Sequence, residues 1–358
     1  MNDATTPLPH DVLDAVARDV MRTRSSRSLA DMTQQRDDRH VSARMKIHIV
    51  CYEDLDAWIL GKIARRLLEE LRSMGMEASV GKEQNPAAEI NHHIVYFDYL
   101  EHKATVETVM VTHIDNEREL NKVLRQLIDV GVEMGICMSY EAVQRLARFA
   151  VPREKLCFIT PAHDGVMKPR RTLVGLTTRV YPDGCKREHL LQELAERISP
   201  EEFKFAIMGS GWDNIVAGMR QRGFEVDYFD RFSYSAYCTL MPSLDYYLYL
   251  GRDEGSMGFL DALAAGVPTI VTRQGFHLDV PDGISYPFDD MSELQAVFSD
   301  IADLKRKRVQ AVSTLTWSRY ARQHLLVWEH LLCRKNGKQT PATLSRELSG
   351  LLAPTGLE

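Results

Sequence analysis

Short apolar runs alternate with amphipathic stretches from residue 45 to residue 160. The run KIHIVC at 46–51 predicts a buried strand, and 58–74 predicts a helix whose apolar residues recur every three or four positions. The following runs predict strands near 77–80, 93–98, 107–112, 133–138 and 155–159, and helices over 116–130 and 139–149. Strands that alternate with helices predict a mostly parallel sheet with helices on both faces.

A second series of the same kind follows a break in the pattern. Residues 161–171 contain two prolines, a glycine and several polar residues, which predicts a linker. Beyond it the pattern predicts strands near 172–178, 203–208, 225–229, 245–250, 269–272 and 284–287, and helices over 186–197, 212–222 and 258–265. We therefore expect an α/β protein with two doubly wound domains, at 45–160 and 172–312, and a ligand-binding cleft between them.

The two ends of the chain fall outside these domains. Residues 1–44 carry seven Arg and seven Asp but no Lys or Glu, and they predict a flexible leader with at most a short helix over 12–21. An extension without chemistry is preferred to a docking arm, because the segment holds few apolar residues. Residues 313–332 predict a helix that packs against one or both domains, and 333–358 predict a polar tail.

Charge and cysteine content narrow the class of protein. A net charge of −6 does not indicate a basic surface for binding nucleic acid. No apolar run reaches membrane-spanning length. The six cysteines form no CxxC pair, and Cys51, Cys137 and Cys157 lie in apolar runs, which predicts buried thiols in a reducing compartment. We expect a cytoplasmic protein without a zinc site, with at most peripheral contact with the inner face of a membrane.

The stretch GRDEGSMGFLDALAAGVPTIVT at 251–272 carries candidate chemistry. It predicts an acidic loop with Asp253 and Glu254, a glycine-rich helix start, a stop at Gly266 and a buried strand. Free N–H groups at a helix start bind phosphate, and nearby carboxylates can hold sugar hydroxyls. Taken alone, an ordinary connection between a helix and a strand explains the stretch slightly better.

Five segments resemble, in order, the motifs of GT-B-fold glycosyltransferases, closest to glycosyltransferase family 4. They are MSYEAVQRLARFAVPREKLCFI (138–159), TPAHDGVMKP (160–169), VGLTTRVYPDGCKREHLLQEL (174–194), FAIMGSGW (205–212) and EGSMGFLDALAAGVPTIV (254–271). The resemblance covers roughly 45–332 and is stronger in the second half. It implies two Rossmann-like domains facing a cleft, an acceptor domain first and a nucleotide-sugar domain second.

The resemblance implies catalytic roles for two basic residues and a histidine. Arg179, at a strand end, and Lys186, at the start of the next helix, would stabilise the charge that grows on a departing diphosphate. His113 in VTHIDN would line the sugar site from the first domain. Gly209, which ends a strand in FAIMGSGW, would belong to the donor site. For each of them, a structural or solvated role is the alternative.

The acidic motif departs from the family spacing. The family has two glutamates with seven residues between them, whereas Glu254 and Asp261 have six between them, and Asp253 and Asp261 have seven. Asp261 would accept hydrogen bonds from the ribose. Glu254 is preferred as the acid that contacts the transferred sugar, because Gly255 follows it as glycine follows the family's first glutamate, and Asp253 remains the alternative.

Backbone N–H groups after this acid would complete the donor site. Those of Gly255, Ser256 and Met257 would meet the diphosphate. The string Asp54-Leu55-Asp56 comes directly after the first strand, too early for a metal-binding DxD motif. We expect no metal and no cofactor apart from the sugar nucleotide itself.

These residues together predict a glycosyltransferase. It would move a sugar from a nucleoside-diphosphate donor to a saccharide or glycoconjugate acceptor, with retention, and the resemblance implies a role in bacterial surface polysaccharide synthesis. Two alternatives stay open. One is a sugar-nucleotide epimerase on the same fold, and the other is a non-catalytic nucleotide-sugar-binding or scaffold protein.

Overall fold

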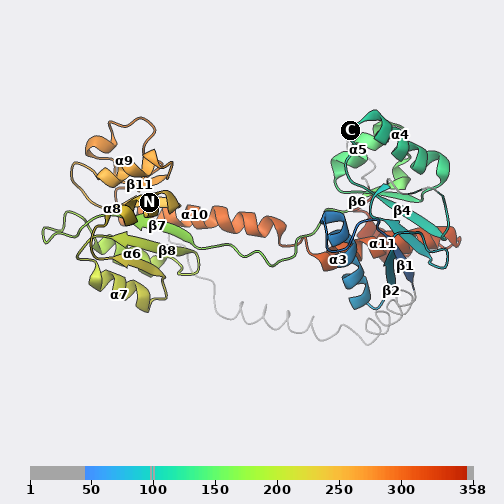
Figure 1. The fold of residues 1–358 in the computed structure, drawn as a ribbon, viewed down its shortest axis with the longest axis horizontal. Helices are drawn as coiled ribbons and strands as arrows, with labels where there is room; N and C mark the ends of the chain where they lie inside the picture. The colour runs from blue at the N-terminus through green and yellow to red at the C-terminus, as the bar shows by residue number, and fades with distance from the viewer. Residues whose placement is uncertain (1–44, 97–98, 100, 353–358) are drawn as a thin grey trace, which may run out of the picture. The chain divides into compact units, whose positions relative to one another are not determined.

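The computed structural model describes residues 45–96, 99 and 101–352. It divides into two compact units (Figure 1). The first unit holds the described residues up to Asp164 and from Leu315 onward, and the second unit is Gly165–Thr314. The predicted leader over 1–44 lies outside the described residues.

The first unit is built on a six-stranded sheet whose paired strands are all parallel. Its order is β2-β1-β3-β4-β5-β6, so the direction of winding reverses between β1 and β3. The strands are β1 (Lys46–Val50), β2 (Glu77–Gly81), β3 (Ile90–His93), β4 (Val106–Val111), β5 (Met134–Cys137) and β6 (Leu156–Phe158).

Helices cover both faces of this sheet. Helix α3 (Ile59–Ser73) packs against Ile47 and Ile49 in one buried cluster. Helices α4 (Glu117–Arg125) and α5 (Tyr140–Arg148) belong to a second cluster that includes Val109 and Val111. In strands, successive side chains alternate between faces, so apolar residues on both faces require two covering layers.

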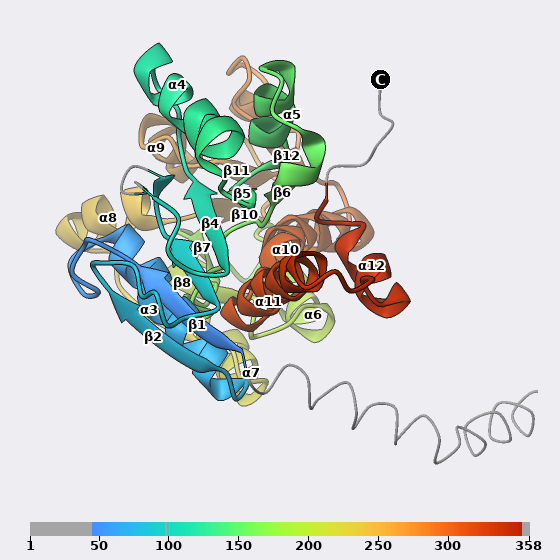
Figure 2. The ribbon, with the colours of Figure 1, turned by 90° about the vertical axis from the view of Figure 1, so that its right-hand side faces the viewer.

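The C-terminal part of the chain returns to the first unit. Helix α11 (Trp317–Lys335), labelled in Figure 2, belongs to the first unit. It packs beside α3 and buries Tyr320 and Trp328 in that unit's core. The stretch predicted as a polar tail contains α12 (Ala342–Leu348). Leu344, Leu348 and Leu351 recur at helical spacing and are buried, so the segment packs on the core rather than extending away from it.

The two points where the chain crosses between units are tied together on the first unit. The backbone N–H of His163 donates to the carbonyl of Leu315 at 3.0 Å. The carboxylate of Asp164 accepts from the indole of Trp317 at 2.8 Å and pairs with Lys62 at 2.6 Å. These contacts anchor both crossings to α3 and α11.

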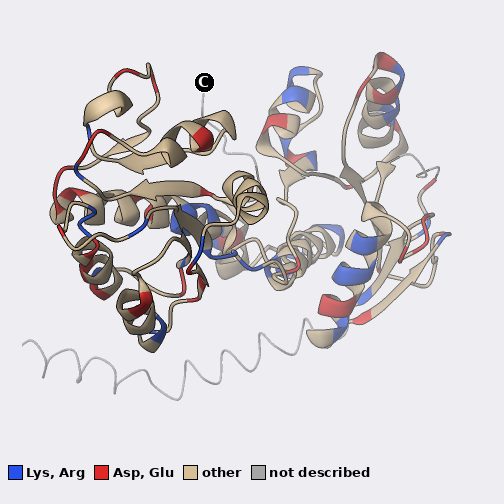
Figure 3. Ribbon diagram, turned by 60° about the vertical axis from the view of Figure 1, so that its left-hand side comes forward, with Lys and Arg blue, Asp and Glu red and all other residues tan. Residues whose placement is uncertain are grey.

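The charges of α3 are largely paired within the unit. This helix carries Lys62, Arg65 and Arg66 in its first half, and Glu69 follows them. Figure 3 shows basic and acidic positions along the helices of each unit. Arg65 pairs with Asp56, and Arg66 pairs with Glu69 at 3.0 Å.

In the part of the chain that is described, no helix has the length and apolarity to span a membrane. Peripheral membrane association stays a prediction.

The second unit is built on another six-stranded parallel sheet, in the order β12-β11-β10-β7-β8-β9. Counted from its first strand, this is 3-2-1-4-5-6 from one edge to the other, the strand order of dinucleotide-binding Rossmann folds. The strands are β7 (Thr172–Leu176), β8 (Phe203–Met208), β9 (Val226–Phe229), β10 (Tyr246–Tyr249), β11 (Thr269–Val271) and β12 (Tyr286–Pro287). The predicted class, with two Rossmann-like α/β units, is confirmed.

Five helices belong to the second unit in its described form. They are α6 (His189–Arg197), α7 (Asp213–Gln221), α8 (Tyr234–Leu240), α9 (Met257–Ala264) and α10 (Met291–Val312). The sequence pattern did not predict α8 or α10. Helix α8 buries no residue fully. Helix α10 buries only Leu294, Phe298, Ile301 and Ala302 of its 22 residues, so neither shows a long apolar stripe.

Candidate functional site

The second sheet reverses its winding between β7 and β10, which pair directly. Ligands of such sheets bind at the carboxyl ends of the strands flanking the reversal. There, Tyr247 of β10 joins the two outgoing loops: its hydroxyl lies 3.2 Å from Oγ1 of Thr177 and 2.7 Å from Oγ of Ser256. A Cβ on Gly258 would lie 2.3 Å from that hydroxyl, so only glycine fits at this point of α9.

Lys186 and Asp253, 67 residues apart, meet at the end of β10. The ammonium of Lys186 pairs with the Asp253 carboxylate and donates to the Tyr249 hydroxyl at 2.8 Å. Tyr249 lies 2.6 and 2.7 Å from the two oxygens of Asp253. Because a phenol has one proton, Tyr249 accepts from Lys186 and donates to Asp253. We call these three residues the Lys186 network.

Charge within the Lys186 network is balanced. Burial alone would raise the pKa of Asp253, but hydrogen bonds from Lys186, Tyr249 and the N–H of Gly255 together hold it below its usual value. Burial, followed by the hydrogen bond to Asp253, raises the pKa of Tyr249. The network is therefore an ammonium, a neutral phenol and a carboxylate at neutral pH.

Arg179 lies beside the Lys186 network. Its guanidinium is 4.6 Å from the centre of the Tyr181 ring and donates to the Tyr181 hydroxyl at 2.9 Å. The Lys186 ammonium lies 5.9 Å from the centre of the same ring. The two predicted diphosphate ligands thus share one aromatic neighbour, which attracts cations through its face.

Gly209 positions the backbone that carries Arg179. It has φ +139°, and a Cβ there would lie 2.2 Å from the carbonyl oxygen of Thr178. The indole of Trp212 donates to the same carbonyl at 2.7 Å. The glycine therefore permits close contact between the loops after β7 and β8, and donor contact by Gly209 itself stays a prediction.

Glu254 and Asp253 differ sharply in their surroundings. The Glu254 side chain is exposed, and its carboxylate makes no hydrogen bond to any residue that the structure describes. Gly255, at φ +117°, turns the chain after it. Asp253 is held internally, whereas Glu254 is available to a ligand. This supports the preference for Glu254 without testing it.

The backbone N–H groups predicted to meet the diphosphate are partly engaged. That of Gly255 donates to Asp253 at 3.0 Å, and that of Ser256 donates to Nε2 of His277 at 3.0 Å. The N–H of Met257, at the first position of α9, has no hydrogen-bond partner among the described residues. In this arrangement Met257 retains the open donor.

His277 was not identified from the sequence. Its Nδ1 lies 3.1 Å from the carbonyl of Thr272 and must donate to it, so Nε2 is the acceptor for Ser256. The ring is therefore neutral, in agreement with a pKa that burial lowers. His277 fixes the loop before α9, and no spacing in the sequence signals this role.

The two remaining predicted residues lie on separate elements. Asp261 is exposed on α9, and its carboxylate accepts a hydrogen bond from Tyr237 of α8. His113 belongs to the first unit, where it follows β4 and lies 3.8 Å from Asp115 with an exposed side chain. The roles implied for both residues stay predictions.

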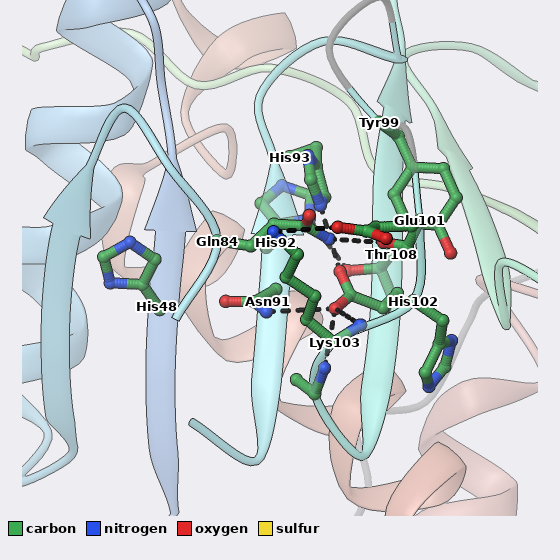
Figure 4. Close-up of polar contacts among 12 residues, drawn as sticks. His48, Gln84, Asn91, His92, His93, Tyr99, Glu101, His102, Lys103 and Thr108 are labelled. Atoms are coloured by element: carbon green, nitrogen blue, oxygen red, sulfur yellow. Dashed lines mark hydrogen bonds and ion pairs between the residues drawn. The ribbon is translucent and has the colours of Figure 1, made fainter. Parts of the chain in front are cut away.

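A buried polar cluster in the first unit surrounds Glu107. Figure 4 labels its neighbours Asn91, His93 and Lys103. One oxygen of this fully buried carboxylate accepts from Asn91 at 3.0 Å and from the N–H groups of Lys103 and Ala104 at 3.0 and 2.8 Å. The other accepts from Nε2 of His93 at 3.0 Å. Although burial alone would raise it, these bonds lower the pKa of Glu107 to about 2. The carboxylate thus joins β3, β4 and the loop between them.

His92 lies in β3 and packs toward α11. Its ring is 5.0 Å from that of His324, and its Nδ1 lies 2.9 Å from the Thr108 hydroxyl. Burial lowers the pKa of His92, and that of His324 to about 4, so both are neutral in the folded protein. His92 and His93 are the last two residues of β3, whereas the sequence pattern predicts a strand near 93–98. One ring nitrogen of each is hydrogen-bonded inside the sheet, while Nε2 of His92 and Nδ1 of His93 are buried without a partner among the described residues.

A cavity of about 370 Å³ lies elsewhere in the first unit. Arg319, Arg322 and Gln323 of α11 and Glu347 of α12 contribute to its wall. Arg322 and Glu347 are paired at 3.2 Å. The cavity does not include the Lys186 network, which belongs to the second unit.

The described residues contain no group of three or more His, Cys, Asp or Glu side chains arranged to hold a metal ion. Of the Asp54-Leu55-Asp56 string, Asp56 pairs with Arg65. Its backbone N–H also donates to Asp54 at 3.0 Å. These contacts make the string part of the loop before α3.

Comparison with known proteins gave only distant likenesses. No family model and no curated protein matches the chain. Among solved structures, Anabaena HepE in complex with UDP and glucose has 13% identity and a TM-score of 0.30, over 82% of this chain and 99% of that one. A glycosyltransferase from Rickettsia africae has 10% identity and a TM-score of 0.33, over 81% and 99%. WaaG, a glycosyltransferase involved in lipopolysaccharide biosynthesis, has 11% identity and a TM-score of 0.32, over 82% of this chain and 100% of that one.

These values are too low to carry function from those proteins to this chain. The fold rests on the strand orders of its two sheets, and the chemistry rests on the side chains at the reversal between β7 and β10.

Proposed function

We propose that the second unit binds a nucleoside-diphosphate sugar and that the protein transfers the sugar to a saccharide or glycoconjugate acceptor. The observation that carries this proposal is the Lys186 network at the strand reversal, with Arg179 on the neighbouring Tyr181 ring. Sugar transfer breaks the bond between the anomeric carbon and a phosphate oxygen, forms a bond from that carbon to the acceptor oxygen, and releases the proton of the acceptor hydroxyl. Fixed positive groups are needed where charge grows on the released diphosphate.

Lys186 is suited to this task because its direction is fixed. Two of its three N–H groups point to Tyr249 and Asp253, which leaves one for a phosphate oxygen. Arg179 adds a planar fork that can bind two oxygens. Exposed Glu254 adds a carboxylate that can accept hydrogen bonds from the sugar hydroxyls. Asp261 adds a second carboxylate, which can accept hydrogen bonds from the ribose.

The finer parts of the proposal rest on the family resemblance. They are retention at the anomeric carbon, a role in bacterial surface polysaccharide synthesis, a site for His113 on the acceptor side, and a cytoplasmic location. The resemblance also supports transfer over epimerisation, since the motifs that match are those of transferases.

The decisive experiment is a screen of UDP-, GDP-, ADP- and CDP-sugars for release of the free nucleoside diphosphate. We expect slow hydrolysis of one class of donor even without an acceptor. An epimerase would convert the sugar without releasing the diphosphate, and a scaffold protein would bind the donor and leave it intact. Either outcome would replace the proposal.

The acidic pair gives a sharper test of the donor site. Glu254→Gln should slow transfer by roughly ten- to a hundred-fold, because a hydrogen bond to a charged group contributes about 1.5–3 kcal/mol. Asp253→Asn should change turnover much less, since the amide can still accept from Tyr249. Turnover of both variants at saturating donor checks this. If the turnover of Asp253→Asn falls strongly while that of Glu254→Gln stays near the wild-type value, the sugar contact belongs to Asp253.

Metal independence is a separate prediction. It is motivated by Arg179 and Lys186, which supply at the diphosphate the positive charge that a divalent cation supplies in other transferases. Transfer should therefore persist in excess EDTA at an unchanged rate. Loss of activity with EDTA and recovery with Mn²⁺ or Mg²⁺ would show that these two residues are insufficient.

A further inference from the structure

We infer a second oxyanion site in the second unit, formed by Arg187, Arg252 and Arg273 at the carboxyl ends of β10, β11 and β12. Arg252 lies in the loop after β10, and Arg273 lies two residues beyond β11. Arg187 arrives from the loop after β7. We call these three residues the arginine cluster.

The arginine cluster converges on Asp289, just past β12. Arg187 Nη1 donates to the carbonyl of Asp289 at 3.0 Å, and Arg252 Nη2 donates to the same carbonyl at 3.2 Å. Nη1 of Arg273 lies 4.0 Å from the Asp289 carboxylate. Asp289 is thus the shared neighbour of all three guanidinium groups, through its carbonyl for two of them and its carboxylate for the third.

Charge in the arginine cluster is not balanced. Three guanidinium groups, which stay protonated in proteins, lie around Asp289. Arg187 and Arg252 bind its carbonyl, and Arg273 lies 4.0 Å from its carboxylate, too far for a hydrogen bond. Nη2 of Arg187 is buried and has no hydrogen-bond partner in the described part of the chain. Burial and the charge of Arg252 both act against the protonated form of Arg187 and lower its pKa. A bound anion would relieve this excess.

The backbone at Arg187 is also unusual. Its φ of +47° lies in the left-handed region, which costs a residue with a Cβ roughly 1–2 kcal/mol relative to glycine. The turn lets consecutive cations reach neighbouring strand ends. Lys186 contacts Tyr249, while Nε of Arg187 donates to the carbonyl of Leu250 at 2.6 Å. An arginine where glycine would be less strained indicates that its side chain has a use.

The ligand expected here is a phosphate or carboxylate group, because guanidinium forks match the two oxygens of either. The arginine cluster and the Lys186 network use consecutive residues of one loop but contact different groups, so the second anion would bind beside the diphosphate and not in its place. The source of the anion rests on the proposed function. It is either the carboxylate of a sugar-acid donor or a phosphate group on the acceptor.

Inorganic phosphate is the first probe. Its binding to the full chain is measured by calorimetry and by ³¹P line broadening, for wild type, Arg252→Gln/Arg273→Gln, and Arg179→Ala/Lys186→Ala. The matched control is Arg197→Gln/Arg222→Gln, since these arginines lie in the same unit and are exposed to a similar degree. Arg187 is left intact because its bonds to Leu250 and Asp289 support the fold.

We expect Arg252→Gln/Arg273→Gln to weaken phosphate binding at least ten-fold and to change nucleoside-diphosphate binding less than two-fold. The Arg179→Ala/Lys186→Ala variant should show the opposite pattern. Absence of phosphate binding to wild type, or equal loss in the control pair, would overturn the inference. So would loss of both ligands together in Arg252→Gln/Arg273→Gln, because the cluster would then be part of the diphosphate site.

A second comparison separates the two sources. UDP-glucuronate and UDP-glucose differ in the carboxylate, so a preference for the former that disappears in Arg252→Gln/Arg273→Gln assigns the cluster to the donor. Phosphate binding that persists on a donor-saturated protein assigns it to the acceptor. If no nucleoside diphosphate binds wild type while phosphate still depends on Arg252 and Arg273, the proposed function fails and the second oxyanion site stands.

Discussion

Lys186→Ala should lower the turnover of sugar transfer by about 10²–10³-fold, the usual cost of removing one preorganised donor from a site of developing negative charge. The substitution has a second effect in this protein. Asp253 loses its cationic partner, and its unpaired carboxylate would then repel the diphosphate. The loss should therefore appear both in turnover and in nucleoside-diphosphate affinity.

The measurement is steady-state transfer at saturating donor, together with the rise in melting temperature that a nucleoside diphosphate produces. Lys204→Ala is the matched control, because Lys204 lies on β8 of the same unit and pairs with an acid, Glu225, at 3.4 Å. Adding Asp253→Asn to Lys186→Ala should restore part of the affinity but little of the turnover. Turnover of Lys186→Ala within a few-fold of wild type would remove Lys186 from the chemistry.

Most strands could be predicted because their residues are apolar on both faces. The run FKFAIM, for example, forms β8 with the predicted bounds. The exception is β3, where INHH is fully buried but polar. The apolar run that follows was taken as the strand instead. A pattern of hydrophobicity cannot detect a strand whose buried residues are satisfied by hydrogen bonds from neighbouring strands.

Residues of the candidate site could be predicted only where the residue type and its neighbours in the sequence suggest a role. Lys186 and Asp253 each stand out beside a glycine-rich or strand-end segment, but their contact depends on β7 and β10 being neighbours. Tyr249 lies in the apolar run YYLY and has the pattern of a core residue, yet its hydroxyl joins the two charges. Such roles follow from strand order, which a single sequence does not specify at residue level.

Glu107→Ala should lower the stability of the first unit by about 3–5 kcal/mol, because several buried donors lose their acceptor at once, at about 1–3 kcal/mol each. For a domain of 150–250 residues this corresponds to a fall in melting temperature of roughly 6–20 °C. Scanning calorimetry is the measurement, with Glu101→Ala as control, since Glu101 lies on the loop before β4 and its side chain is 66% exposed. Nucleoside-diphosphate binding by the second unit should be unaffected. An unchanged melting temperature would contradict the role assigned to the Glu107 cluster.

Glu107→Gln then tests whether the buried carboxylate is charged. The pKa of Glu107 is about 2 in the folded protein, against an ordinary value of 4.5, so its stabilising effect is complete above pH 4.5 and is lost as the pH falls toward 2. Glutamine does not titrate. The stability difference between wild type and Glu107→Gln should therefore be constant from pH 7 to about 5 and narrow steadily below 4.5.

The buried histidines His92 and His324, whose pKa values are lowered, cost stability in both proteins as the pH falls below 6.5, and this contribution cancels in the difference. A difference that stays constant down to pH 3 would mean that Glu107 is neutral in the fold and that His93 donates to a carboxylic acid.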